Sequence, residues 1–163
     1  MTASARRSME TLYGEDYVLW AEKTAEQLRQ KDFASLDLEN LIEEIESMGR
    51  SERQAVESLL TRLIEHLLKL AYWESERERN ARHWIVEIAS FRGQLRKKIK
   101  TPTLATHARD SFGEAYSDAR QTLIEARIIG ENEIPVEPPF SLEQTLDGKW
   151  FPIPVDRFRE NRE

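Results

Sequence analysis

An acidic segment in the first third of the chain carries the side chains best suited to chemistry. The segment DLENLIEEIESMG, residues 37–49, contains five carboxylates within thirteen positions. They are Asp37, Glu39, Glu43, Glu44 and Glu46. Closely spaced carboxylates can act as a general acid and base, or they can bind a metal ion together with histidine. The alternative is a solvated helix face with one structural ion pair, and the sequence favours that alternative because structural ion pairs are common.

Three histidines are the other candidate metal ligands. They are His66, His83 and His107, and each falls on a different expected helix. At about 1.5 Å of rise per residue, His107 would lie roughly 17 Å farther along an antiparallel bundle than the other two. His83 and His107 also point away from the apolar stripes of their helices. We therefore expect no metal site and no cofactor.

The elements that position these side chains are helices. From Tyr13 to Gly130 apolar residues recur with the 3.6-residue period of buried helix faces. The expected helices cover about 16–29, 38–48, 51–73, 75–99 and 102–126. Asp37 is the expected N-cap of the second helix and Gly49 its end. Whether the second and third helices are separate or form one kinked rod is left open by the sequence.

Capping signals mark the expected starts of three helices. The pairs Ser51 with Gln54, Ser75 with Glu78, and Ser141 with Gln144 have the spacing of capping boxes. Pro102 suits a first helical turn. After Gly130 the chain is rich in proline, and its anchors are expected to be Phe140, Trp150, Phe151 and Ile153.

These signals predict an all-α fold. We expect an antiparallel bundle of about five helices with an irregular, Pro-rich C-terminal wrap that carries one short helix. The expected domain organisation is a flexible N-terminus over residues 1–12, a single helical domain over residues 13–155 and a mobile tail over residues 156–163.

The helical wheel of residues 38–48 separates the acids. Leu38, Leu41, Ile42, Ile45 and Met48 form an apolar stripe that we expect to face the core. Glu39, Glu43 and Glu46 then point to solvent, whereas Glu44 borders the core. A carboxylate at the edge of a core needs a partner, or its pKa rises. The expected partners of Glu44 are Arg50, Arg53 and Arg92.

His66 lies at the edge of the widest apolar face in the chain. It has two interpretations: a catalytic base that titrates near neutral pH, or a neutral histidine with one satisfied hydrogen bond. The second is favoured because buried polar groups are usually just paired. The expected fourth helix ends in a run of bases: Arg92, Arg96, Lys97, Lys98 and Lys100. They could bind phosphates. The favoured interpretation is that they stabilise the helix C-terminus, where the helix dipole is negative.

Composition narrows the function further. The 163 residues carry a net charge of −6 and no cysteine, so nucleic-acid binding is not favoured and thiolate chemistry is excluded. No run is long and apolar enough to span a bilayer, and no secretory signal follows the first residues. We expect a cytoplasmic protein with no membrane partner. Phosphate-binding loops and the common hydrolase motifs are missing from the sequence.

Three motifs between Tyr13 and Trp73 belong together. They are Asp16-Tyr17 with Trp20, the block D-LENLIEEIE-MGRSE at residues 37–52, and HLLK at residues 66–69. With these motifs the segment resembles the bacterial family named domain of unknown function 29. The resemblance extends through the AYSDA and PFSLEQTL segments to about residue 152. The resemblance implies an all-α fold and implies no activity. It marks as members of the family pattern Asn40, Glu43, Glu44, Gly49, Arg50, His66 and Lys69.

Two functions follow from these patterns. The leading hypothesis is a protein-binding or self-associating module without catalysis, in which Asn40, Glu43, Glu44, Arg50, His66 and Lys69 are the candidate binding residues. The alternative is a small metal-dependent hydrolase or nuclease that uses Glu44, Glu43 and His66. In that case Glu44 and His66 would be the catalytic candidates.

Overall fold

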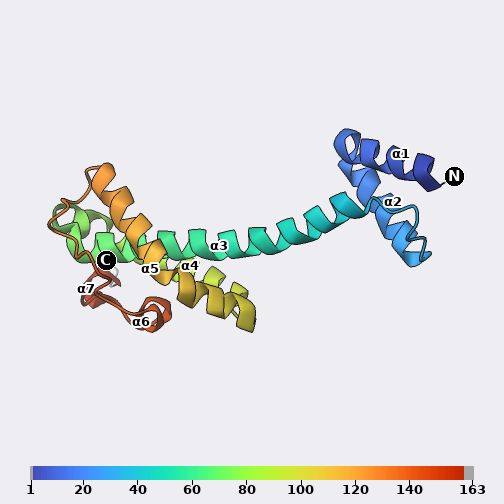
Figure 1. Ribbon diagram of the computed structural model, residues 1–163. Coiled ribbons are helices and arrows are strands. Elements are labelled where there is room, and N and C mark those ends of the chain that lie inside the picture. The colour runs from blue at the N-terminus through green and yellow to red at the C-terminus, as the bar shows by residue number, and fades with distance from the viewer. Residues whose placement is uncertain (1, 160–163) are drawn as a thin grey trace. The chain divides into compact units, whose positions relative to one another are not determined.

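The regular structure of this protein is helical. The computed structural model describes residues 2–159, with side chains from residue 8 onward, and every regular element in that part of the chain is a helix (Figure 1). The predicted all-α class is therefore confirmed. Within the same residues, no helix combines the length and the apolarity needed to cross a bilayer. The chain divides into two compact units, unit 1 over residues 1–51 and unit 2 over residues 52–163.

Unit 1 contains α1 (Thr2–Glu15), α2 (Tyr17–Arg29) and the beginning of α3 (Leu38–Tyr72). Asp16 separates α1 from α2, because its carboxylate accepts a hydrogen bond from the amide of Leu19 at 3.0 Å and so caps α2. Helix α1 includes residues 2–12, for which the sequence predicted flexibility. Their mobility stays a prediction, as does that of the tail, of which residues 160–163 lie outside the described part.

Helix α3 is one continuous helix of 35 residues. The expected helix end at Gly49 and the expected capping box at Ser51 are both wrong, because each residue lies inside α3. A glycine inside a helix costs roughly 1 kcal/mol relative to alanine, which helical neighbours can offset. Here Arg50 bridges back to Glu43 at 2.6 Å and to Glu46 at 3.7 Å, so ion pairs hold the turns on both sides of Gly49 together.

Unit 2 is built on the remainder of α3 together with α4 (Glu74–Lys98) and α5 (Pro102–Glu125). Helices α3 and α4 run antiparallel. The Trp73 and Trp84 rings stack near the turn, with centroids 5.6 Å apart, whereas Lys98 at the far end of α4 reaches Glu52 at 3.0 Å. Helix α5 returns alongside α3, since His107 bonds to Glu57 at 2.7 Å. The predicted bundle is thus present in unit 2.

The core of unit 2 uses the apolar stripes that the sequence indicated. The fully or nearly buried residues of the three helices are Val56, Leu60, Leu63, Ile64, Leu67, Leu68, Leu70, Ala81, Trp84, Ile85, Ile88, Phe91, Leu95, Ala108, Ala115, Tyr116, Ala119 and Leu123. The small alanines of α5 let that helix approach its neighbours closely. The helical period predicted for the apolar residues of these three helices is therefore confirmed.

The turn between α3 and α4 differs from its prediction. Helix α4 begins at Glu74, and its N-cap, Trp73, makes no side-chain capping bond, so the expected capping box at Ser75 is wrong. Arg77 instead donates hydrogen bonds to the carbonyls of Leu70 and Ala71, at 2.8 and 2.6 Å. These carbonyls belong to the last turn of α3, where no intrahelical donor remains for them. The Arg77 guanidinium on α4 therefore satisfies the last carbonyls of α3 and holds the two helices together at their turn.

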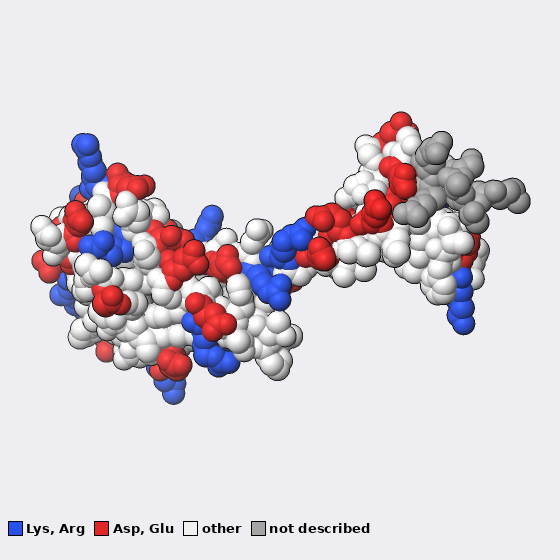
Figure 2. All heavy atoms as spheres, viewed as in Figure 1, with Lys and Arg blue, Asp and Glu red and all other residues white. Residues whose placement is uncertain are grey.

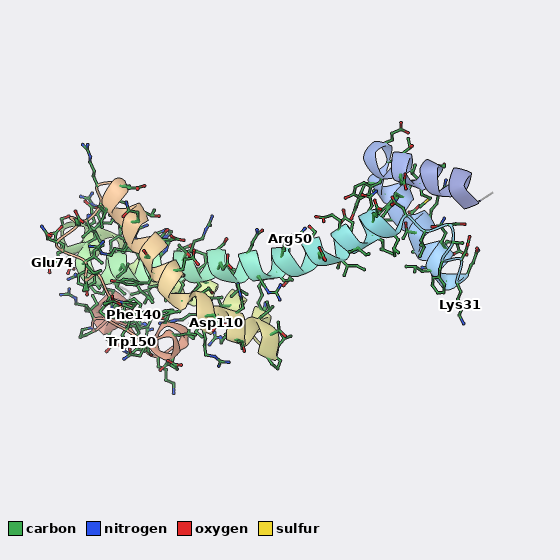
Figure 3. All side chains as sticks on the ribbon, viewed as in Figure 1. Lys31, Arg50, Glu74, Asp110, Phe140 and Trp150 are labelled. Carbon is green, nitrogen blue, oxygen red and sulfur yellow. The ribbon has the colours of Figure 1, made fainter. Side chains whose placement is uncertain are left out.

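The C-terminal segment of unit 2 packs against the helical bundle and contains α6 (Leu142–Leu146) and α7 (Asp156–Arg159). The capping box of Ser141 and Gln144 is present, as predicted. Phe140 is buried, and its ring lies 5.5 Å from that of Trp150 (Figure 3). The other expected anchors, Phe151 and Ile153, also pack against the core.

Arg92 ties this segment to α4. Only 1% of its surface is exposed. Its Nε donates to the carbonyl of Thr145 at 2.8 Å, and its Nη2 donates to the carbonyls of Trp150 at 2.9 Å and Gln144 at 3.4 Å. Burial lowers the pKa of Arg92 to about 10, which leaves it charged at neutral pH. Of the run of bases, Arg96, Lys97 and Lys98 lie in the last turn of α4, as expected for the negative end of the helix, whereas Arg92 is buried.

Replacing Arg92 with alanine should lower the free energy of unfolding by about 3 kcal/mol, because three carbonyls then lose a charged donor in a dry environment. The change is measured by urea denaturation. Amide exchange should rise in residues 141–151. Arg96→Ala is the matched control, since Arg96 is exposed on the same helix, and it should change stability by less than about 0.5 kcal/mol. Equal effects of the two variants would contradict the role of Arg92.

Candidate functional site

The residues of the acidic segment that point inward meet an aromatic group in unit 1. We call this group the Glu44 cluster. Its members are Tyr13, Tyr17, Trp20, Asp37, Asn40 and Glu44. They come from the end of α1, the first turns of α2 and the first turns of α3. The cluster therefore joins all three helices of unit 1.

Glu44 accepts a hydrogen bond on each of its oxygens. The Tyr13 hydroxyl donates to Oε1 at 2.5 Å, and the Tyr17 hydroxyl donates to Oε2 at 2.9 Å. Behind these phenols the rings pack on one another. The Trp20 ring lies edge-on to Tyr13 at 4.9 Å and stacked with Tyr17 at 5.7 Å, between centroids. Glu44 is thus held by two donors that are themselves fixed by a third ring.

Asp37 forms the buried half of the cluster. It is completely shielded from solvent. The Trp20 indole donates to its Oδ2 at 3.2 Å, and the Asn40 amide side chain donates to the same oxygen at 2.7 Å. The backbone N–H of Asn40 points to Oδ1 at 3.4 Å, which is the capping role that the sequence predicted for Asp37. One carboxylate therefore starts α3 and anchors α2 against it.

The hydrogen bonds shift the pKa values of the cluster. The bond to Glu44 raises the pKa of Tyr13 to about 12, with burial and the Glu44 charge adding to the effect. The pKa of Tyr17 is raised for the same reason. Conversely, the Tyr13 and Tyr17 hydroxyls lower the pKa of Glu44. The interaction stabilises the fold above pH 4.5, the ordinary pKa of Glu44, and below pH 10, the ordinary pKa of Tyr13.

The partners expected for Glu44 are wrong. None of Arg50, Arg53 and Arg92 contacts it through a hydrogen bond or ion pair that the structure records; the donors are phenols. The orientation of the first turns of α3 explains this difference. Helix α3 turns its partly polar face, with Asn40, Leu41 and Glu44 half-buried, toward α1 and α2. The signal for this choice was available in the spacing of Tyr13, Tyr17 and Trp20, which share one face of the preceding helices.

The apolar stripe next to that face is consequently exposed, although the sequence predicted it to face the core. The exposed fractions are 51% for Leu38, 48% for Ile42, 60% for Ile45 and 68% for Met48. We call these four residues the apolar face. Also exposed in unit 1 are Tyr17, Val18, Leu19, Leu28 and Phe33. Isolated exposed apolar residues are ordinary, but four at successive helical turns form a contiguous patch.

The remaining candidate residues lie apart from the Glu44 cluster. Glu43 pairs with Arg50 on the exposed side of α3. His66 lies in unit 2, where its ring is 5.3 Å from that of Phe91 and its Nδ1 bonds to the carbonyl of Arg62 at 2.8 Å. Burial lowers the pKa of His66, so it is neutral at pH 7. Lys69 is half-buried one turn farther along α3.

No group of three histidine, aspartate or glutamate residues in the described part of the chain has the arrangement of a metal site. A hollow of about 790 Å³ is present in unit 2 and contains none of the candidate residues. It is lined by Tyr72, Trp73, Glu74, Ser75, Ile128, Ile129 and Glu133. The arrangement in unit 1 can hold two helices against a third, and it leaves an apolar surface open beside them.

Replacing Glu44 with glutamine should bring the pKa of Tyr13 down from about 12 toward 10, because the carboxylate that stabilises the neutral phenol is lost. The titration is followed by the ultraviolet absorbance of tyrosinate. Tyr13→Phe is the control that identifies the transition, since it removes this group alone. If the tyrosine titrations of the Glu44→Gln variant and the unchanged protein coincide, the hydrogen bond to Glu44 does not set the pKa.

Comparison with known families places this chain. The model of the family described as domain of unknown function DUF29 matches residues 12–151. No curated protein and no solved structure matches the chain. The matched region contains every residue of the Glu44 cluster and of the apolar face. Because the match spans most of the chain, this protein belongs to the DUF29 family.

Proposed function

We propose that this protein is a protein-binding or self-associating module without catalytic activity, and that it docks through the apolar face of unit 1. The observation that carries the proposal is the exposure of Leu38, Ile42, Ile45 and Met48 on successive turns of α3. The cytoplasmic location expected from the sequence stays a prediction.

Exposure of the apolar face has an energetic consequence. Fully burying one such side chain stabilises by about 1.5–3 kcal/mol, and roughly half of each is still accessible. Covering the four residues would therefore contribute on the order of 4 kcal/mol for each molecule that carries the face. That is enough to drive association once a partner of matching shape is present, because the face lies on a preformed helix and little ordering is needed.

The Glu44 cluster supports the same function in an indirect way. By bonding Tyr13 and Tyr17, Glu44 commits one face of α3 to α1 and α2. The adjoining apolar face then remains outside the packed interior of unit 1. Asn40 and Glu44, which were candidate binding residues, thus orient the docking surface, and they do so without contacting the partner themselves.

The metal-dependent hydrolase has weaker support. Its proposed ligands each have another bond in place: both oxygens of Glu44 are bonded to phenols, Glu43 is paired with Arg50, and Nδ1 of His66 is bonded to a backbone carbonyl. A metal ion would have to compete with all of these contacts. No observation in the described residues favours that function over docking.

The double variant Ile45→Glu/Met48→Glu tests the proposal. A tagged chain is cross-linked in its source cells, and the expected product is a discrete complex with a protein, which is either another protein or an untagged copy. The variant should reduce that product about tenfold, because charges replace the apolar contact. Circular dichroism should be unchanged, since both positions are exposed.

The matched control is Val86→Glu/Val136→Glu. These valines are as exposed as the apolar face, at 59% and 75%, but both belong to unit 2. The control should cross-link like the unchanged protein. Equal cross-linking by the unchanged protein and the Ile45→Glu/Met48→Glu variant would refute docking through the apolar face.

A further inference from the structure

We propose that the occupant of the apolar face is the same face of a second copy of this chain, with the two α3 helices antiparallel. This inference rests on the proposed docking function and makes it specific. Three features carry it: the shape of the apolar face, the order of charges beside it, and the covering of its other side by α1 and α2.

The apolar face is suited to a helix of the same kind. Leu38, Ile42 and Ile45 repeat at the three- and four-residue spacing that packs one helix against another. By the helical period, Gly49 falls on the same stripe, where its missing side chain lets a facing backbone come close. Beyond it the stripe reaches Glu52, which is paired with Lys98. The face therefore spans about three helical turns, roughly 16 Å.

Charged residues lie along one side of the apolar face in a fixed order. At 100° per residue, the carboxylates of Glu39, Glu43 and Glu46 and the guanidinium groups of Arg50 and Arg53 share one sector of α3. The acids come first and the bases last. Figure 2 shows this order, with acidic residues over the first turns of α3 and basic residues next to them. The position of Arg50 on α3 is marked in Figure 3.

This order of charges selects the direction of the second helix. In an antiparallel pair the same side of each helix meets its counterpart, so Arg50 and Arg53 of one copy lie beside Glu39 and Glu43 of the other. A parallel pair would instead bring the charged side of one helix against the Asn40 and Glu44 side of the other, which α1 and α2 already cover. The existing Arg50–Glu43 pair is exposed, and such pairs exchange partners at little cost.

The other side of the apolar face is already occupied within each copy. Asn40 and Glu44 lie there, and they are bonded to the residues of α1 and α2 described above. A second helix is therefore confined to the apolar face and the charged side. The arrangement is self-complementary about a two-fold axis, as in most homodimers. With the axis beside Ile45, Ile42 of one copy lies at the same height along the pair as Met48 of the other.

Cysteine cross-linking tests this geometry with a clean background, because the chain contains no cysteine. The purified variants Ile42→Cys and Met48→Cys are oxidised separately and as a mixture. We expect the mixture to give at least about five times more disulfide-linked dimer than either variant alone. Val86→Cys, on an exposed position of α4, is the control and should not cross-link. Self-linking of each variant at the level of the mixture would overturn the antiparallel arrangement.

Reversing the charges on α3 tests the same pairing, with the molecular mass in solution as the measured quantity. The variants Arg50→Glu/Arg53→Glu and Glu39→Lys/Glu43→Lys should each be monomeric by light scattering, and their mixture should be dimeric. The variant that combines all four changes should dimerise by itself, because it restores opposite charges between copies. A monomeric combined variant would overturn the charge pairing.

These outcomes are separable from failure of the proposed function. If the unchanged protein is monomeric at about 100 μM, self-pairing is overturned. Docking through the apolar face is then judged by the cellular cross-linking of the Ile45→Glu/Met48→Glu variant alone. If that variant cross-links normally, the apolar face binds nothing, and both proposals fail together.

Discussion

The continuity of α3 is the constraint on which both units depend. One helix supplies the first-turn residues that meet α1 and α2, and farther along it supplies the central apolar face of the unit 2 core. Within unit 1, the helical period fixes the angles between neighbouring residues in the first turns of α3. Because Glu44 binds Tyr13 and Tyr17, one side of these turns faces α1 and α2. The direction of the apolar face follows from that contact.

The sequence predicted unit 2 well because a helix buried on several sides leaves a strong pattern. Residues such as Leu63, Ile88 and Tyr116 recur at helical spacing, and their burial follows from hydrophobicity alone. The Ser141 capping box was also predictable, since its two hydrogen bonds are local. By contrast, the same kind of signal at Ser51 and Ser75 was misleading. A capping box describes a possible helix start, and a neighbouring helix or an arginine such as Arg77 can make it unnecessary.

Unit 1 was harder to predict for a physical reason. Hydrophobicity places Ile42 and Ile45 inside, whereas the structure turns the half-buried Asn40 and Glu44 toward α1 and α2. Phenol and indole donors make that possible, because they satisfy the carboxylates while their rings supply the apolar contact. An amphipathic pattern identifies the apolar side of a helix but does not tell whether the same chain covers it. The direction of Glu44 could have been inferred only by considering Tyr13 and Tyr17 as its donors.

The position of Arg92 has a consequence for the order in which the chain folds. Its acceptors, the carbonyls of Gln144, Thr145 and Trp150, follow it by 52 to 58 residues. Until the C-terminal segment packs against α4, the guanidinium must stay hydrated. Contacts between residues so far apart in the chain form more slowly than local ones. A segment that follows the bundle helices in the chain thus completes the interior at α4, and until it does so unit 2 is open there.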